Sequence, residues 1–365
     1  MGIEQLISYI ALGAPATRRP ASGSLPFLRP EIGFTPNWYH KSLGIDFGEK
    51  YHTNPAYRRE AILKMREEVN HRFPVNKIGK MDDPDGTLDL LTGLYGACSI
   101  ASIFDVPIRY STDNWPVNEH VHLSDEEMMN LQPIDPANTP FFQSIMDQVD
   151  WIAALEGKVV GFMNWQGVLN NAQRLRGPQL FMDMLIDPEM TKNLLECVCT
   201  TMIDSAKLLQ KKQNESGMNY TFFTVSNCLV NMLSSDLYEE FILPFDKRIA
   251  EAFETIGIHN CAWNTNPYLD HYASIPKVGY IDMGMDSDLA KARMLFPETR
   301  RAIMYTPMDL ANKSTVKIQK DLEYIALNYG PCDIVAADIE HGTPDGKVLD
   351  LIQLCKDISE RSEIK

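Results

Sequence analysis

The sequence predicts an α/β protein with the fold of a (β/α)8 TIM barrel, and three observations lead to this prediction. Short apolar runs alternate with amphipathic helical stretches along the 365 residues of the chain. Eight such runs occur, which is the number of strands that closes this barrel. The glycine-rich GxGxxG turn of a nucleotide-binding doubly wound sheet is absent. A doubly wound sheet that binds no nucleotide is the structural alternative.

The predicted elements begin after an irregular N-terminal arm. Residues 1–25 form this arm, because Arg18 to Ser24 have the composition of a loop, and residues 26–365 are expected to form a single barrel domain. The second of the apolar runs has a composition that suits a helix as well as a strand. The expected strands are residues 31–36, 98–107, 159–167, 220–227, 257–263, 278–285, 300–307 and 332–339.

Two of the intervening helices have clear start and stop signals. One is expected to begin with Asp187 as N-cap and Pro188 at the first helical position, and it ends in basic residues. Leu194, Val198 and Met202 follow a helical period along it. The second covers residues 234–257 and contains Pro244, which is expected to split it into two pieces.

The composition excludes several classes of function. The formal net charge of −15 and the pI near 5.0 argue against a nucleic-acid-binding protein and against a polybasic membrane-surface protein. No apolar run approaches the ~20 residues needed to cross a bilayer, and the N-terminal stretch lacks the pattern of a secretory signal. The seven scattered cysteines indicate free thiols in a reducing compartment. We therefore expect a cytoplasmic protein with no nucleic-acid or membrane partner.

The ends of the expected strands carry many polar and aromatic side chains. In a barrel these positions face the substrate. The residues found there are Asn37, Trp38, Tyr39, His40, Asn164, Trp165, Gln166, Asn227, Cys228, Trp263, Asn264, Asp282, Tyr305, Asp338, Glu340 and His341.

His259 and Cys261 form the strongest pair of candidate metal ligands. On a strand, residues i and i+2 point to the same face, and they are roughly 6.6 Å apart along the chain. An imidazole and a thiolate in this arrangement can bind one tetrahedral ion such as zinc. The HxC pattern alone is more typical of a core histidine beside a small buried hydrophobe, so further ligands are needed. Cys197 and Cys199 fall inside the helix from Asp187 and are interpreted as packing residues.

Five segments in the same order resemble the uroporphyrinogen decarboxylase superfamily, a family of (β/α)8 barrels. They look closest to the branch that contains the cobalamin-dependent methyltransferases. The segments are RPEIGFTPNWYHKSLGID, LRGPQLFMDMLIDPEMTKNLLECV, LSSDLYEEFILPFDKRIAEAF, IHNCAWN and DIEHGTPDGKVLDLI.

Two departures from the decarboxylases bear on the function. Their arginine- and glycine-rich RQAGRY-type stretch, which grips the carboxylates of the substrate, corresponds here to the nearly uncharged FTPNWYHKS. A tetrapyrrole with eight carboxylates would find few cationic partners there. The aspartate that such decarboxylases use at the fourth strand is replaced by Asn227. Porphyrin decarboxylation is therefore not expected.

The methyltransferase branch implies a zinc site with an HxC pair on the fifth strand and a cysteine on the eighth. His259 and Cys261 match the first two positions, but Ala337 occupies the expected place of the third ligand. Cys332 lies five residues earlier on the same strand, about 16 Å away, so it does not replace this ligand. The further ligand can come from Asp338, Glu340, His341 or Cys228, or the metal site is lost.

The resemblance implies a zinc-dependent methyltransferase. It would move a methyl group between a small methylated substrate, of the ether or thiol type, and a corrinoid, as in methylcobalamin. The corrinoid would come on a separate protein, because the chain has no DxHxxG sequence. The resemblance places His259 and Cys261 at the catalytic centre, and Asp282 is expected there as a partner behind a ligand or as a substrate contact. The expected substrate contacts are Asn37, Trp38, Tyr39, His40, Trp165, Asn227, Trp263 and Tyr305.

Two other functions are compatible with the same barrel. One is a metal-free decarboxylase or lyase that acts on a non-porphyrin substrate, with His259 as acid or base. The other is a non-catalytic binding barrel. This alternative stays open because Ala337 occupies the position where a metal ligand is expected. The sequence does not decide between a monomer and a homodimer.

Overall fold

A computed structural model describes residues 27–73 and 87–363 of the chain. The predicted arm over residues 1–25 lies outside this part. Six strands form one parallel sheet in the order β1, β8, β7, β6, β5, β4. Their bounds are β1 Leu28–Phe34, β4 Phe222–Ser226, β5 Thr255–His259, β6 Val278–Met283, β7 Arg300–Met304 and β8 Cys332–Ile339.

The strand order is that of the predicted barrel. β1 pairs with β8, beginning at Leu28 and Cys332, so the first and last strands of the sheet are neighbours. A doubly wound sheet reverses its strand order at a switch point, whereas here each strand from β4 to β8 pairs with the next in the chain. The second and third strand positions of the barrel are taken by two short segments, one around Asp89 and one around Val160. An isolated parallel bridge between these two residues joins the segments. The fold is therefore an α/β barrel.

The prediction for the second strand was wrong. Residues 98–107 do not form a strand, because Ser99–Ile103 is the short helix α4, and the segment around Asp89 takes the strand position. The third predicted strand, residues 159–167, is reduced to the bridge at Val160. A short apolar run cannot be distinguished from a buried helix by its periodicity, which explains the first error.

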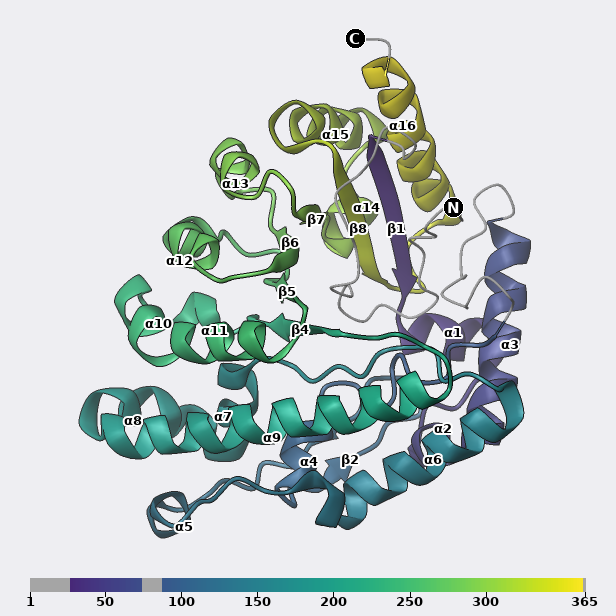
Figure 1. Cartoon of the computed structure of the whole chain (residues 1–365). Helices are drawn as coiled ribbons and strands as arrows, with labels where there is room; N and C mark the ends of the chain where they lie inside the picture. Colours follow the sequence, from purple (N-terminus) through teal and green to yellow (C-terminus); the bar gives the residue numbers. More distant parts are fainter. Residues whose placement is uncertain (1–26, 74–86, 364–365) are drawn as a thin grey trace.

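Helices surround the sheet (Figure 1). α16 packs beside β1, and α9 runs across the width of the molecule. A small antiparallel pair, β2 Ile108–Arg109 and β3 Val117–Asn118, completes the strands of the described part. The helices are α1 Pro36–Leu43, α2 Glu49–Thr53, α3 Pro55–Arg72, α4 Ser99–Ile103, α5 Asp125–Met129, α6 Pro140–Glu156, α7 Val168–Arg176, α8 Leu180–Ile186, α9 Pro188–Glu215, α10 Ser235–Phe241, α11 Leu243–Ala252, α12 Leu269–Ala273, α13 Leu289–Leu295, α14 Pro307–Asn312, α15 Thr315–Tyr329 and α16 Asp345–Glu363.

The two helices with clear sequence signals are confirmed. The Asp187 side chain accepts a hydrogen bond from the backbone N–H of Met190 at 3.1 Å, and Pro188 opens α9. The predicted helix over residues 234–257 is split into α10 and α11, with Pro244 in the first turn of the second piece. Cys197 and Cys199 are buried in α9, as packing residues should be.

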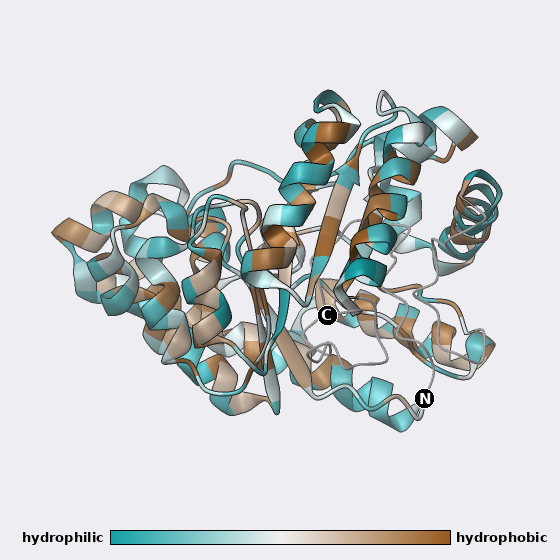
Figure 2. Ribbon diagram, turned by 90° about the horizontal axis from the view of Figure 1, so that it is seen from above, coloured by the Kyte–Doolittle hydropathy of each residue, from teal (hydrophilic) through white to brown (hydrophobic). Residues whose placement is uncertain are grey.

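The buried apolar residues of the described part form a large outer core and two small clusters, one of which consists of Tyr220 and Phe222. The outer core lies between the strands and the helices. Along the helices, hydrophobic and hydrophilic residues alternate, as the colours of Figure 2 show. Tyr280, Ala302 and Val335 form the inner cluster, with Ala337 packed against it. Val335 and Ala337 are two residues apart on β8, so they share its inner face. No helix in the described part of the chain is long and apolar enough to cross a membrane.

The inner face also carries a buried ion cluster. Arg29 of β1 and Arg300 of β7 both contact Asp333 of β8, and all three side chains are almost completely buried. Asp333 Oδ2 accepts a hydrogen bond from Arg300 Nε at 2.7 Å, and Asp333 Oδ1 accepts one from Arg29 Nε. One carboxylate therefore ties three neighbouring strands together inside the barrel.

Candidate metal centre and its cavity

Two cysteines and a histidine meet at the ends of β4 and β5. Cys261 Sγ lies 3.0 Å from Cys228 Sγ and 3.2 Å from His259 Nε2. The ligand atoms of all three residues lie within 4.8 Å of one another. In residues 27–73 and 87–363 no other group of three such side chains is close enough to hold a metal ion. We refer to Cys228, His259 and Cys261 as the CHC group.

Strand pairing places Cys228 beside the HxC pair. Ser226 pairs with His259, and the backbone N–H of Asn227 donates to the His259 carbonyl at 2.7 Å. The expectation that His259 and Cys261 lie on one strand was wrong, because β5 ends at His259. Cys261 lies in a turn with φ +55°, a left-handed conformation that is uncommon for a residue with a Cβ. This turn, and not strand alternation, brings the Cys261 thiol near His259 Nε2.

Asp282 supports the CHC group from β6. Its Oδ2 lies 2.6 Å from His259 Nδ1, and its Oδ1 accepts a hydrogen bond from the backbone N–H of Asn260 at 2.7 Å. The Tyr280 hydroxyl also donates to Asp282 Oδ2, at 3.0 Å. Because an ionised carboxylate only accepts, the Nδ1–H of His259 is the donor. The other ring nitrogen, Nε2, faces Cys261.

The charges in the CHC group favour a thiolate. The hydrogen bond from Cys261 lowers the pKa of the Cys228 thiol, and His259 lowers this pKa further, although burial opposes both effects. Burial lowers the pKa of His259, but Asp282 and the two cysteines raise it more, so that the net pKa is well above its usual value. The thiolate is the form of cysteine that binds metals. These effects favour the form of Cys228 that binds a metal ion.

The CHC group fits a zinc ion. Tetrahedral zinc with three such ligands needs about 3.8 Å between its two sulfur atoms and about 3.6 Å between sulfur and nitrogen. The separations of 3.0 and 3.2 Å are shorter than these by less than an ångström, a change that small side-chain rotations can make. A carboxylate behind the ligating histidine is the usual support of zinc sites. Three protein ligands also leave one position of the ion for a substrate.

A cavity of about 680 Å³ opens onto the CHC group. Cys228 and His259 line it, together with Asp338. The remaining wall is rich in amide and charged side chains, many of them from α7 and the segment before it. In the described part of the chain these polar wall residues are Asn118, Glu119, His120, His122, Asn164, Gln166, Asn170, Gln173 and Arg174.

The predicted substrate contacts on the first strand lie elsewhere. Trp38 and Tyr39 are fully buried in α1, and both pack against Phe34. The Asn37 amide donates to Asp113 at 3.1 Å, and His40 Nδ1 lies 2.9 Å from the Ile45 carbonyl. None of these four residues lines the cavity.

The other four predicted contacts are also absent from the cavity wall. Trp165 is buried, whereas the Trp263 side chain is 46% exposed. The Tyr305 hydroxyl donates to Asp321 at 2.8 Å. The Asn227 amide is buried and donates to Asp246. A role for these residues in substrate binding stays a prediction, and none of them lines the cavity described here.

The structure separates the candidates for the further ligand. Ala337 lies in the inner apolar cluster, and Glu340 accepts a hydrogen bond from the Thr35 hydroxyl at 3.3 Å. His341 is exposed. Asp338 lines the cavity, where the surrounding protein raises its pKa to about 6. Among the candidates, Cys228 alone belongs to the CHC group of the described residues.

Arg174 and its neighbours on α7 were missed from the sequence. The barrel rule concerns strand ends and the loops that follow them. Here the third strand is almost absent, so the chain passes directly into α7 and the cavity wall continues along that helix. The run QGVLNNAQRLRG carries five amide or arginine side chains between its first residue and Arg174. This concentration of polar groups after an apolar run was the available signal.

Asp246, behind Asn227, makes folding stability depend on pH. Its Oδ2 accepts hydrogen bonds from Asn227 Nδ2 and the Tyr238 hydroxyl, both at 2.8 Å, and burial raises its pKa to about 6. The native state thus binds this proton more tightly than the unfolded chain, whose aspartate pKa is about 3.9. The resulting stabilisation is complete below about pH 4 and is lost as the pH rises through about 6.

We therefore expect Asp246→Asn to become more stable relative to the wild type as the pH rises. From pH 4.5 to pH 7.5 the difference in unfolding free energy between the two should shift by about 2 kcal/mol in favour of the variant. Urea unfolding of both proteins at the two pH values measures this shift. Parallel pH profiles would contradict the raised pKa.

Comparisons with known proteins agree with this fold. Residues 87–315 match the sequence model of a family described as uroporphyrinogen decarboxylase (URO-D). No curated protein matches the chain. Among solved structures, a methyltransferase from Methanosarcina mazei is similar with a TM-score of 0.60 and 13% identity, over 98% of this chain and 95% of that chain. A B12-independent methionine synthase from Shewanella sp. W3-18-1, in complex with selenomethionine, aligns with a TM-score of 0.46 and 10% identity, over 93% and 98% of the two chains. At this identity the likeness to the first structure concerns the fold alone.

Proposed function

The chain belongs to the uroporphyrinogen decarboxylase family, and we propose that within this family it is a zinc-dependent methyltransferase. It moves a methyl group between a small ether or thiol-type substrate and a corrinoid that a separate protein carries. The observation that carries this proposal is the CHC group, which combines three zinc-type ligands with the Asp282 carboxylate behind the histidine.

Decarboxylation of a porphyrin is not proposed. The segment around Trp38 and Tyr39 turns these aromatic side chains into the core and supplies no cationic side chain to the cavity wall described above. At the fourth strand, Asn227 has an amide where the decarboxylases have an acid, and this amide is engaged with Asp246. A substrate with many carboxylates is therefore a poor match.

His259 Nε2 and the thiolates of Cys228 and Cys261 would hold the zinc ion. When bound, the ion supplies a Lewis acid that stabilises negative charge on the substrate heteroatom. Asp282 keeps His259 in the tautomer whose Nε2 lone pair is free for this role, and its contact with the Asn260 backbone fixes the turn that carries Cys261.

In this proposal the side chains of the cavity position the substrate and supply a proton. The reaction breaks the bond between the methyl carbon and the heteroatom, and the electron pair of that bond stays on the heteroatom. The corrinoid would supply the acceptor for the methyl carbon, so the cavity would have to hold donor and acceptor in line. Asp338, with a pKa of about 6, can hold the proton that the leaving heteroatom takes up.

Metal analysis combined with a transfer assay tests the function. We expect about one zinc per chain in protein purified without chelators. We also expect methylcobalamin to form from reduced cobalamin and at least one member of a panel of small methyl ethers and thioethers. Removal of zinc by a chelator should abolish the transfer, and added zinc should restore it. Protein that binds no zinc when zinc is supplied would refute the proposal and favour a metal-free decarboxylase or lyase.

A further inference from the structure

Arg174 brings a positive charge into the wall of the cavity. It lies on α7 and is partly buried. Its Nη1 donates to the carbonyl of Asn170, one turn earlier on the same helix, at 3.2 Å. Within residues 27–73 and 87–363, no carboxylate lies within ion-pair distance of Arg174, and its Nε and Nη2 have no hydrogen-bond partner. These donors are left for whatever occupies the cavity.

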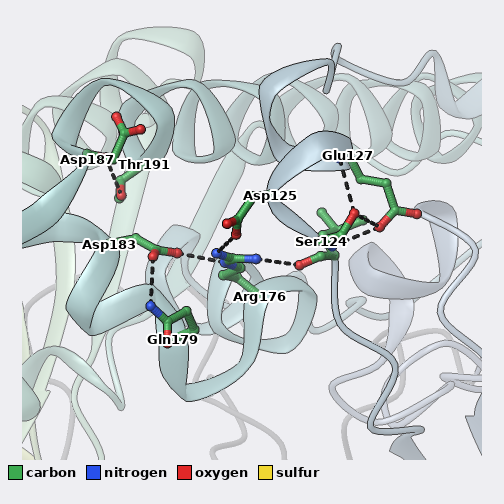
Figure 3. A network of polar contacts seen from close by, with 9 residues as sticks. Ser124, Asp125, Glu127, Arg176, Gln179, Asp183, Asp187 and Thr191 are labelled. Carbon is green, nitrogen blue, oxygen red and sulfur yellow. Dashed lines mark hydrogen bonds and ion pairs between the residues drawn. The ribbon is translucent and has the colours of Figure 1, made fainter.

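Arg176, two residues further on, provides a contrast on the same helix (Figure 3). Its Nε donates to Asp183 at 2.6 Å, its Nη1 donates to the Leu123 carbonyl at 2.6 Å, and its Nη2 donates to Asp125. Gln179 adds a hydrogen bond to Asp183 at 3.1 Å. Arg176 thus has two carboxylate partners and anchors the end of α7, whereas Arg174 in the cavity has none in the described part.

The start of the same helix is tied to the CHC group. Asn170 Oδ1 accepts a hydrogen bond from the backbone N–H of Leu229, the residue after Cys228, at 3.3 Å. Gly167, just before α7, approaches β4 so closely that a Cβ there would lie 2.4 Å from the Ser226 carbonyl oxygen. Arg174 and Cys228 are therefore held in one rigid frame.

The chemistry of a partly desolvated guanidinium favours one class of ligand. Burial lowers the pKa of Arg174, which reflects the hydration that the group has lost, although an arginine stays charged in a protein. A carboxylate compensates best for the lost hydration, because its two oxygens can accept hydrogen bonds from both Nε and Nη2. The amides of Asn170 and Gln173 beside it contribute no competing negative charge.

We propose that Arg174 forms an anion-binding subsite of this cavity and that the substrate carries a carboxylate group there. The proposal rests on the function proposed above, and it makes the methyl donor an anionic molecule whose heteroatom reaches the CHC group while its carboxylate binds Arg174. The cavity of about 680 Å³ has room for a small molecule that spans the two positions. The competing explanation is that Arg174 only balances the charge of the Cys228 thiolate.

Isothermal titration calorimetry with matched pairs of probes tests this subsite. The probes are methoxyacetate, 3-(methylthio)propionate and 4-methoxybenzoate, each beside its neutral carboxamide. Zinc-loaded wild type should bind at least one carboxylate, and bind it at least about tenfold more tightly than its amide. Arg174→Gln should lose this preference, Arg174→Lys should keep part of it, and Arg361→Gln, at an arginine 59% exposed on α16, should keep all of it.

Three results would overturn the subsite. These are an Arg174→Gln variant that binds the carboxylates as the wild type does, equal binding of acid and amide, and no binding of any carboxylate by the wild type. If Arg174 only balances the thiolate, Arg174→Gln should change the zinc affinity instead, and equal zinc affinity in both proteins removes that explanation. The two proposals fail separately: a carboxylate preference without zinc or methyl transfer refutes the methyltransferase, and transfer from neutral donors without the preference refutes the subsite.

Discussion

Replacing Cys228 with serine is expected to lower the zinc affinity of the protein at least about 100-fold. The serine hydroxyl is a poor zinc ligand, and the substitution removes the one thiol whose pKa the group lowers. Loss of a hydrogen-bond partner behind a ligand already costs about 10–100-fold in metal affinity, and loss of the ligand itself should cost more. Titration of zinc against a competing chelator measures the change, and methyl transfer should fall with the zinc content.

Two variants in the same cavity serve as controls for Cys228. Cys98 lines the cavity without belonging to the CHC group, so Cys98→Ser should leave the zinc affinity within about threefold. Asp338→Asn tests the rival ligand, because Asp338 lines the cavity together with His259. If Asp338→Asn lost zinc while Cys228→Ser kept it, the third ligand would be the carboxylate, and the assignment of Cys228 would be wrong.

Local signals in the sequence were enough to predict most of the barrel. The Asp187 cap, the break at Pro244 and the eighth strand at 332–339 each depend on neighbouring residues alone, and the structure contains all three. The second strand position could not be predicted in this way. It is taken by the short segment around Asp89, whose side chain accepts hydrogen bonds from the backbone of Leu91 and Thr92. A buried turn of this kind has no strand periodicity.

The centre could be predicted only in part, for a related reason. The HxC pair is a local pattern, so His259 and Cys261 were found from the sequence. Cys228 was one of four candidates, because its place depends on the pairing of Ser226 with His259. The sequence of neither strand alone predicts this register. Trp38 and Tyr39 were expected at the cavity because they follow the first strand, but α1 begins at Pro36 and turns both side chains into the core.

Replacing Asp333 with alanine is expected to lower the free energy of unfolding by about 3–5 kcal/mol. Its carboxylate is shared by Arg29 and Arg300 inside the barrel, and these side chains are at most 2% exposed. Breaking such a buried cluster leaves guanidinium groups in a low-dielectric interior without the charge that compensated them. Arg29 is especially sensitive, since its Nη1 and Nη2 have no other hydrogen-bond partner among the described residues. Chemical denaturation at neutral pH measures the loss.

The matched control is Asp125→Ala, which removes an exposed aspartate from the largely buried Arg176. The Asp125 side chain is 75% exposed, and its partner Arg176 keeps the contact with Asp183, so the cost should stay below about 1 kcal/mol. If Asp333→Ala does not fold, Asp333→Asn keeps the size and one acceptor oxygen and should show a smaller loss in the same direction. Equal costs for Asp333→Ala and Asp125→Ala would mean that water reaches the cluster, and that the barrel interior around Asp333 is not as dry as its buried arginines indicate.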